Sequence, residues 1–148
     1  MTISFTVPGE PKGKGRPRFT TRGGYAKTYT PVETANYESL VRLAYFQSYG
    51  ELMLEGALSL EVAAYFPIPK SASKKQQSKM LKREVLPTRR PDADNLLKVV
   101  QDALNGVAYK DDCQLASVSC SKFYSDKPLV EVTLSELEIT EGAVENGK

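Results

Sequence analysis

Residues 58–67 read Leu-Ser-Leu-Glu-Val-Ala-Ala-Tyr-Phe-Pro, with an apolar side chain at every second position until the proline. This period of two is typical of a β-strand that buries one face, and the proline predicts where the strand ends. Residues 3–7 alternate in the same way and predict an earlier strand. Residues 118–122 and 130–134 follow this period too, so we expect two more strands there.

A helix is expected between the first two strands, after a stretch rich in glycine, proline and basic residues. That stretch, residues 8–29, is interpreted as a loop or an irregular hairpin. Thr30 then stands at the N-cap position, Pro31 suits the first helical position and Glu33 completes a capping box. Gly50 is a natural end for this helix. The side chains expected on its apolar face are Tyr37, Leu40, Leu43 and Ala44.

Two more helices are expected between the second and third strands. Residues 71–84 form a polar, basic helix that opens at Ser71 or Ser73, and residues 94–105 form a helix with one apolar face. The inward side chains expected in the second of these are Leu96, Val100, Ala103 and Leu104. Helices combined with about four strands in this order predict an α+β fold, in which the helices pack against one small mixed sheet.

Length and composition indicate one globular domain. The chain has 148 residues, of which 41% are hydrophobic and 26% are charged. A chain of this size buries enough surface to fold without disulfides or a structural metal. We expect a single domain over residues 1–140 and a disordered tail over the small, polar residues 141–148.

Several sequence features indicate a cytoplasmic location. The start of the chain lacks the basic and apolar regions of a secretory signal, and no apolar run approaches the roughly 20 residues of a membrane span. The two cysteines, Cys113 and Cys120, match no zinc-binding pattern. We expect them to be reduced thiols.

The sequence contains no histidine, which narrows the possible chemistry. This absence excludes Ser-His-Asp and Cys-His catalytic arrangements, histidine-ligated zinc and histidine general acid–base catalysis. Any catalysis must therefore depend on carboxylates, lysine, arginine, hydroxyls or a metal ion held by oxygen.

Positive charge is concentrated in two segments. Residues 10–27 carry six basic side chains against one glutamate, and residues 70–90 carry eight against one, although the whole chain has a net charge of only +2. One lysine-rich run is usually plain solvated surface, but two such segments in a small chain favour binding of a polyanion. Within residues 13–18, glycines permit close approach to a ligand and arginines can bind phosphate oxygens in pairs. The residues expected to bind nucleic acid are Lys12, Lys14, Arg16, Arg18, Lys74, Lys75, Arg89 and Arg90.

Aspartates stand at both ends of the helix expected over residues 94–105. Asp92 and Asp94 lie one residue apart at its start, and the pair Asp111-Asp112 follows its end. Three or four carboxylates within reach of one point repel one another unless a divalent cation or a proton compensates. Mg²⁺ takes one or two carboxylates together with water and phosphate oxygens, which suits phosphodiester hydrolysis beside basic segments. A nearby lysine would stabilise the charge that develops on the phosphoryl oxygens.

Each of these aspartates also has a simpler interpretation. Asp92 or Asp94 can cap the free N–H groups at the start of the helix. Asp94, Lys98 and Asp102 are spaced for ion pairs along one helix face. Asp111-Asp112 is typical of a turn that precedes a strand.

The segment 92–112 resembles the signature of a known family. It reads Asp-Ala-Asp-Asn-Leu-Leu-Lys and continues Val-Val-Gln-Asp-Ala-Leu-Asn-Gly-Val-Ala-Tyr-Lys-Asp-Asp. This closely resembles the RusA family of Holliday-junction resolvases. The resemblance extends to Gly13-Lys-Gly-Arg-Pro-Arg18, Tyr29-Thr-Pro31 and Phe66-Pro-Ile-Pro-Lys70, and so covers most of residues 3–135.

This resemblance implies a small homodimeric endonuclease of phage or prophage origin that acts in DNA recombination and repair. Such an enzyme uses Mg²⁺ to cut four-way DNA junctions symmetrically. Asp92 and Asp94 match the family's paired metal-binding aspartates, Asp112 matches its third catalytic, metal-binding aspartate, and Lys98 matches its catalytic lysine. Asp111 leaves the third assignment open, because neighbouring side chains in extended chain point to opposite faces.

The sequence therefore predicts a Mg²⁺-dependent endonuclease that resolves branched DNA by paired incisions. Two alternatives stay open. A broader structure-selective nuclease, acting on flaps or forks, would use the same metal site. A non-catalytic module would bind DNA through the basic segments, with the aspartates serving only as caps and in ion pairs.

Overall fold

Four strands form one mixed sheet in the computed structural model, which describes residues 1–14, 18–20, 27–29 and 32–137. The order across the sheet is β1-β6-β4-β5; β6 is antiparallel to β1 and β4, whereas β5 is parallel to β4. The strand bounds are Thr2–Pro8 for β1, Leu58–Pro67 for β4, Leu115–Ser125 for β5 and Leu129–Glu136 for β6. The α+β class and the four-stranded mixed sheet expected from the sequence are confirmed.

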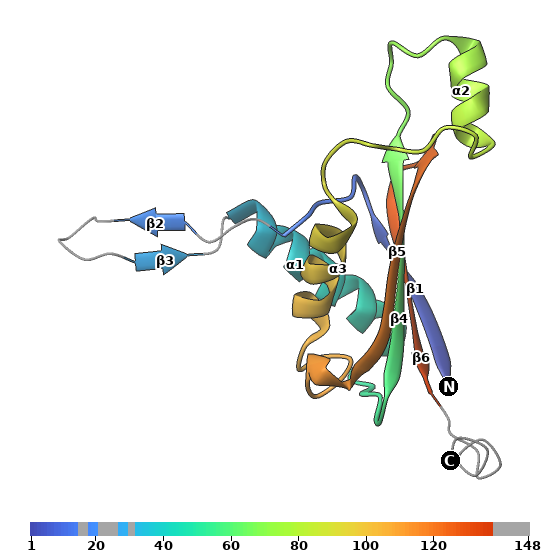
Figure 1. Cartoon of the computed structure of the whole chain (residues 1–148). Coiled ribbons are helices and arrows are strands. Elements are labelled where there is room, and N and C mark those ends of the chain that lie inside the picture. Colours follow the sequence, from blue (N-terminus) through green and yellow to red (C-terminus); the bar gives the residue numbers. More distant parts are fainter. Residues whose placement is uncertain (15–17, 21–26, 30–31, 138–148) are drawn as a thin grey trace, which may run out of the picture.

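Two helices cover one face of this sheet. Helix α1 (Val32–Tyr49) packs against β1 and α3, and α3 (Ala93–Leu104) packs against β4 and β5. Figure 1 shows both helices on the same side of the sheet. The alternation in β4 explains this arrangement, because every second side chain from Leu58 to Phe66 is buried on the helix side.

The apolar stripe of α1 differs in one residue from the expectation. Tyr37, Val41, Ala44 and Tyr45 are buried, with Leu40 packed against the core, but Leu43 is 52% exposed. The expectation that Leu43 faces inward was wrong, because the buried positions follow the spacing i, i+4, i+7 and i+8, and Leu43 falls beside that stripe. The capping residues expected at 30 and 31 lie outside the described residues.

In α3 the four expected inward side chains are all buried, and Val99 joins them.

Helix α2 (Lys74–Leu81) buries no side chain and stands beyond the end of the sheet (Figure 1). It begins at Ser73, whose side chain accepts a hydrogen bond from the Gln76 N–H at 3.2 Å, so Ser73 is the cap rather than Ser71.

The glycine-rich stretch near the N-terminus contains a hairpin, which is one of the two structures expected there from the sequence. Strand β2 (Arg18–Thr20) pairs antiparallel with β3 (Lys27–Tyr29).

The tail expected over residues 141–148 lies outside the described residues. Among the helices that the structure describes, none has the length and apolar character needed to cross a bilayer.

Candidate active site

Two exposed aspartates stand at the start of α3. Asp92 is the N-cap residue, but its side chain makes no capping hydrogen bond; its carbonyl oxygen accepts from the Leu96 N–H at 3.0 Å. Asp94 follows in the first helical turn. Within the described part of the chain, neither carboxylate forms an ion pair. The helix N-terminus stabilises these negative charges, which stay free to bind a cation.

The basic N-terminal segment lies directly against this helix start. The Lys14 N–H donates to the Asn95 carbonyl oxygen at 3.1 Å. A Cβ atom on Gly13 would lie only 2.7 Å from Cβ of Pro91 and 3.1 Å from Cβ of Asn95. Only glycine therefore allows the segment to approach this closely.

Lys14 connects the two helices through ion pairs. Its Nζ lies 2.9 Å from a Glu38 carboxylate oxygen in α1 and 3.1 Å from an Asp102 carboxylate oxygen in α3. Asp102 also lies 3.3 Å from the Lys98 Nζ, one turn earlier in α3. Partial burial alone would lower the pKa of Lys14, but its hydrogen bonds to Glu38 and Asp102 outweigh that effect and the pKa is raised. The sequence had suggested a phosphate contact for Lys14, whereas the structure places its ammonium between two carboxylates.

We expect Lys14→Met to destabilise the protein by about 1–2 kcal/mol, because two partly buried carboxylates lose their shared cation. Urea denaturation at neutral pH measures the change. The matched control is Lys12→Met, which removes an exposed lysine that has no ion pair among the described residues. Because the pKa of Lys14 is raised, this contribution persists at neutral pH and is lost only as the pH rises through that raised value, above about 10.4. Equal stability of both variants would contradict the bridging role.

The two aspartates after α3 differ in what their side chains do. Asp111 caps a short 3₁₀ turn over Asp112–Gln114: its carboxylate accepts from the Cys113 N–H at 3.2 Å, and the Gln114 side chain accepts from the Asp111 N–H at 3.1 Å. The Cys113 N–H, followed by Asp112, lowers the pKa of the Asp111 carboxyl. The Asp112 carboxylate takes no part in this capping box, so it is the better candidate for catalysis.

Two side chains next to Asp112, one buried and one half-buried, fix the position of its turn by hydrogen bonds to other parts of the chain. The Tyr109 hydroxyl donates to the Gln101 carbonyl oxygen in α3 at 2.8 Å, and Gln114 Nε2 donates to the Gly56 carbonyl oxygen at 3.0 Å. Burial raises the pKa of Tyr109, and the charges of Asp112 and Asp102 raise it further. The Tyr109 hydroxyl therefore connects the segment before Asp112 to the C-terminal half of α3.

The expected convergence of three carboxylates is not seen in the described residues. No group of three Asp, Glu or Cys side chains there is close enough to hold one metal ion. The free pair Asp92 and Asp94 nevertheless fits Mg²⁺, which takes one or two carboxylates and completes its shell with water and phosphate oxygens.

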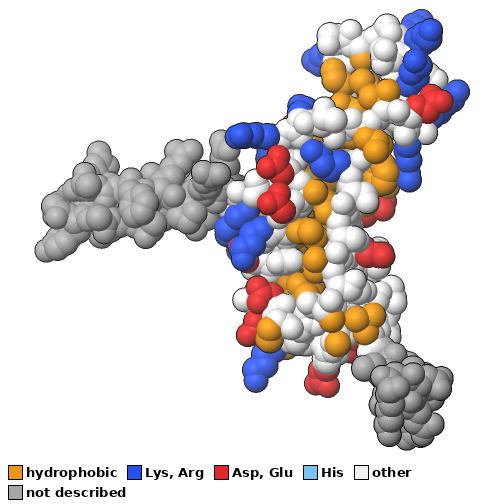
Figure 2. All heavy atoms as spheres, in the orientation of Figure 1, with side chains coloured by type: hydrophobic (Ala, Val, Ile, Leu, Met, Phe, Trp, Pro, Cys, Tyr) orange, Lys and Arg blue, Asp and Glu red, His pale blue; other side chains and the backbone are white. Residues whose placement is uncertain are grey.

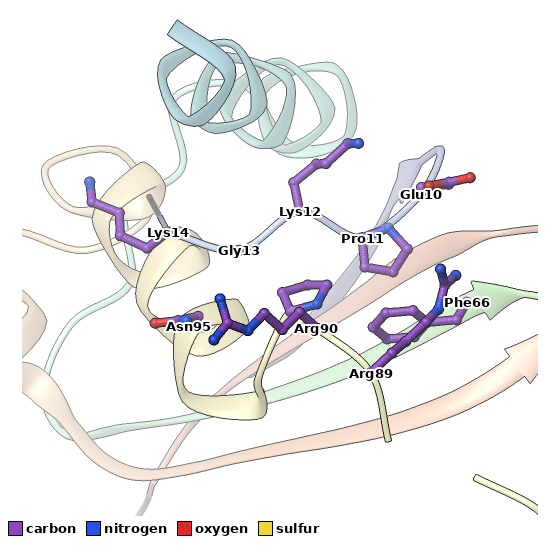
Figure 3. Close-up of a pocket in the computed structure, with 10 residues that line it drawn as sticks. Glu10, Pro11, Lys12, Gly13, Lys14, Phe66, Arg89, Arg90 and Asn95 are labelled. Carbon is purple, nitrogen blue, oxygen red and sulfur yellow. The ribbon is translucent and has the colours of Figure 1, made fainter. Parts of the chain in front are cut away.

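A basic pocket adjoins the start of α3 (Figure 3). It has a volume of about 330 Å³ and lies between residues 10–14, residues 89–91 and the Phe66 side chain of β4. Arg89 and Arg90 are exposed at its wall, and Glu10 is the one carboxylate among the described residues that line it. A pocket of this charge next to two free carboxylates would hold an anion beside a candidate metal site.

A family model matches the part of the chain that contains this site. The model of the family described as "Endodeoxyribonuclease RusA" matches residues 8–135, which include the basic segments, α3 and the turn at Asp112. The chain belongs to the RusA family. It is also 42% identical over 137 residues to the uncharacterized protein YqaN of Bacillus subtilis (strain 168), an alignment that covers 91% of this chain and 96% of that relative.

Two other basic residues of this RusA family chain that were expected to bind DNA, Lys74 and Lys75, lie apart from the pocket. Lys74 and Lys75 are exposed on α2, and Figure 2 shows Lys and Arg side chains gathered around α2 at the top of the view. Arg16 and the side chain of Arg18 lie outside the described residues. The described side chains among those expected to bind DNA therefore form two groups, one at the α3 start and one on α2.

Two side chains of the site were missed by sequence reasoning. Glu38 holds Lys14 from a different helix, and no local pattern signals that pairing. Gln114 closes the turn at Asp112, and here a signal was present, because Asp111 and Gln114 have the spacing of a capping box.

Proposed function

We propose that this RusA family endodeoxyribonuclease is a Mg²⁺-dependent enzyme that resolves four-way DNA junctions. The observation that carries the proposal is the free carboxylate pair Asp92 and Asp94 beside a basic pocket. Carboxylates without a cation partner would repel a DNA phosphate, and a bound divalent ion reverses that effect.

The residues of the chain have distinct roles in this proposal. Asp92 and Asp94 would hold Mg²⁺, with Asp112 as the further catalytic carboxylate that the family pattern assigns. When bound, the ion supplies a more acidic water and charge stabilisation at the phosphodiester. Lys98 stabilises negative charge on the phosphoryl oxygens, and its ion pair with Asp102 orients its ammonium along α3.

The basic groups bind the DNA backbone and position the junction without reading sequence. Arg89 and Arg90 line the pocket at the start of α3, just before Asp92 in the sequence, and Lys74 and Lys75 extend the contact along α2. Each phosphate contact releases a counterion from the DNA, so affinity depends on the salt concentration.

We expect junction affinity to fall by roughly a thousandfold between 50 and 200 mM salt, as for a protein with about six to ten phosphate contacts. Anisotropy of a labelled junction without Mg²⁺ measures this change. The double variant Lys74→Gln, Lys75→Gln should reduce the slope of log affinity against log salt by about two. A slope near zero for the parent protein would contradict binding through backbone phosphates.

Paired incision requires two active sites, which a homodimer provides for a two-fold symmetric junction. The outer edge of β5 supports this part of the proposal. Residues 116–119 are exposed, and the sequence from Leu115 to Ser121 contains no charged residue or proline. Exposed edge strands usually carry such residues to block further pairing. Two copies would pair these edges antiparallel about a two-fold axis.

Val118→Lys is therefore expected to convert the dimer to a monomer in sedimentation experiments at micromolar concentration. Val118 is 44% exposed on this edge. Leu43→Lys is the matched control, because Leu43 is a similarly exposed apolar residue on α1. A parent protein that stays monomeric with junction present would contradict paired incision, and a dimeric Val118→Lys variant would contradict pairing through β5.

The proposed activity is tested with a labelled four-way junction, a flap and a linear duplex, each with and without Mg²⁺. We expect symmetric nicks in the junction alone, and only with the metal. Equal cutting of the flap would favour the broader structure-selective nuclease. Binding without any cleavage product would favour the non-catalytic module.

A further inference from the structure

The pocket at the start of α3 has a shape and chemistry that simple phosphate binding does not require. Pro11 and Phe66 form buried parts of its wall, and Glu10 and Asn95 lie at opposite ends of it (Figure 3). Its volume of about 330 Å³ is at the lower end of the range typical of small-molecule sites. An exposed phosphate contact on DNA needs only surface cations, whereas this open pocket has room for a larger group.

Arg89 presents a flat surface inside this pocket. Its Cζ lies 5.4 Å from the centroid of the Phe66 ring, and the Lys122 Nζ lies 5.1 Å from the same centroid. Lys122 also donates a hydrogen bond to the Arg89 carbonyl oxygen at 2.6 Å, which holds the backbone of Arg89 in place. Because Phe66 is only 2% exposed, the plane available to a ligand is the Arg89 guanidinium rather than the ring.

The charge of the pocket selects an anionic ligand. Arg89 and Arg90 form no ion pair within the described part of the chain, and Arg90 points toward Asn95 (Figure 3). Asn95 and Glu10 add hydrogen-bonding groups at the two ends. A nucleotide is flat, anionic and able to form hydrogen bonds, and so it fits these features of the pocket.

Only an unstacked nucleotide can reach this position. A base inside a continuous duplex is covered by its neighbours on both faces, and a pocket of this size admits one base but no duplex. Arg89 and Arg90 directly precede Asp92 by way of Pro91, so a nucleotide in the pocket would adjoin the phosphate held at the metal-binding pair. At a branch point a nucleotide leaves the stack with a small free-energy cost, because stacking is already interrupted there.

We propose that this pocket binds one unstacked nucleotide at the branch point of the DNA, with its base stacked on the Arg89 guanidinium. The inference rests on the proposed function and deepens it, because it names the feature of branched DNA that the site recognises. Base stacking on arginine tolerates any sequence, so the pocket would select structure rather than a particular base.

The test uses a four-way junction that carries 2-aminopurine, a base whose fluorescence increases when it leaves the stack, either at the branch point or within one arm. All measurements omit Mg²⁺, so that no strand is cut. We expect the parent protein to increase the fluorescence of the branch-point probe and to leave the arm probe unchanged. In Arg89→Lys the charge is kept but the flat surface is lost, so we expect most of the increase to disappear and affinity to fall by roughly tenfold.

Lys75→Gln is the control variant, because it removes a phosphate contact on α2 without altering the pocket. It should weaken binding but keep the full fluorescence increase in the saturated complex. No increase in the parent complex, an equal increase in the arm, or an unchanged increase in Arg89→Lys would each overturn the inference. Cleavage of the unmodified junction by the parent protein, measured in parallel with Mg²⁺, is not affected by these outcomes and separates failure of the pocket from failure of the proposed function.

Discussion

Asp92→Asn and Asp94→Asn are each expected to reduce junction cleavage by roughly a thousandfold while junction binding is kept. The amide has nearly the shape of the carboxylate but lacks the negative charge that Mg²⁺ requires. Neither side chain forms a capping hydrogen bond or an ion pair in the described structure, so neither substitution removes a contact that the fold uses. Loss of cleavage would then report on the cation rather than on unfolding.

Rates from single-turnover cleavage of a labelled junction, together with affinities measured without Mg²⁺, separate the two effects. Glu131→Gln is the control, because Glu131 is exposed on β6 and points to the sheet face opposite the helices. Removal of one negative charge near DNA should leave affinity equal or slightly higher in the two aspartate variants. A variant of Asp92 or Asp94 that cuts at the parent rate would contradict the metal-binding role.

The sheet and the α3 helix were predictable because their patterns are local. In β4 every second side chain enters the core, and in α3 the buried residues repeat at helical spacing. Strand β5 was only partly predicted, as residues 118–122 rather than Leu115–Ser125. It lies at the sheet edge, where serines alternate with exposed Ala116 and Val118. Because this part of the strand buries no side chain, its sequence lacks a clear alternation of apolar and polar residues.

The candidate site was predictable in its residue types but not in its distances. The aspartates at the two ends of α3 were recognised, yet no three carboxylates among the described residues lie close enough together to hold one metal ion. The Lys14 ammonium forms an ion pair with Glu38, and the two residues meet only because α1 packs on α3. Such pairings arise from tertiary structure and leave no spacing that a sequence pattern can reveal.

The adjacent pair Asp111-Asp112 provides a second test, in which two identical substitutions should have opposite consequences. Asp112→Asn is expected to lower junction cleavage by roughly a hundredfold and to leave thermal stability unchanged, because the Asp112 carboxylate takes no part in the capping box. Asp111→Asn should keep most of the cleavage, since its carboxylate serves the turn by accepting from the Cys113 N–H. Single-turnover rates and thermal midpoints for both variants measure these effects.

The pH dependence of stability separates the two aspartates further. The pKa of Asp111 is lowered in the folded protein, chiefly by the Cys113 N–H. A lowered pKa means that the carboxylate stabilises the fold above about pH 4, the ordinary value for aspartate, and that this contribution is lost as the pH falls through the lowered pKa. The parent protein and Asp112→Asn should both lose this contribution in acid, since its chief cause, the Cys113 N–H, is present in both, whereas Asp111→Asn lacks it at every pH. Cleavage abolished by Asp111→Asn but retained by Asp112→Asn would reverse the assignment and show that the capping carboxylate, not its neighbour, acts in the reaction.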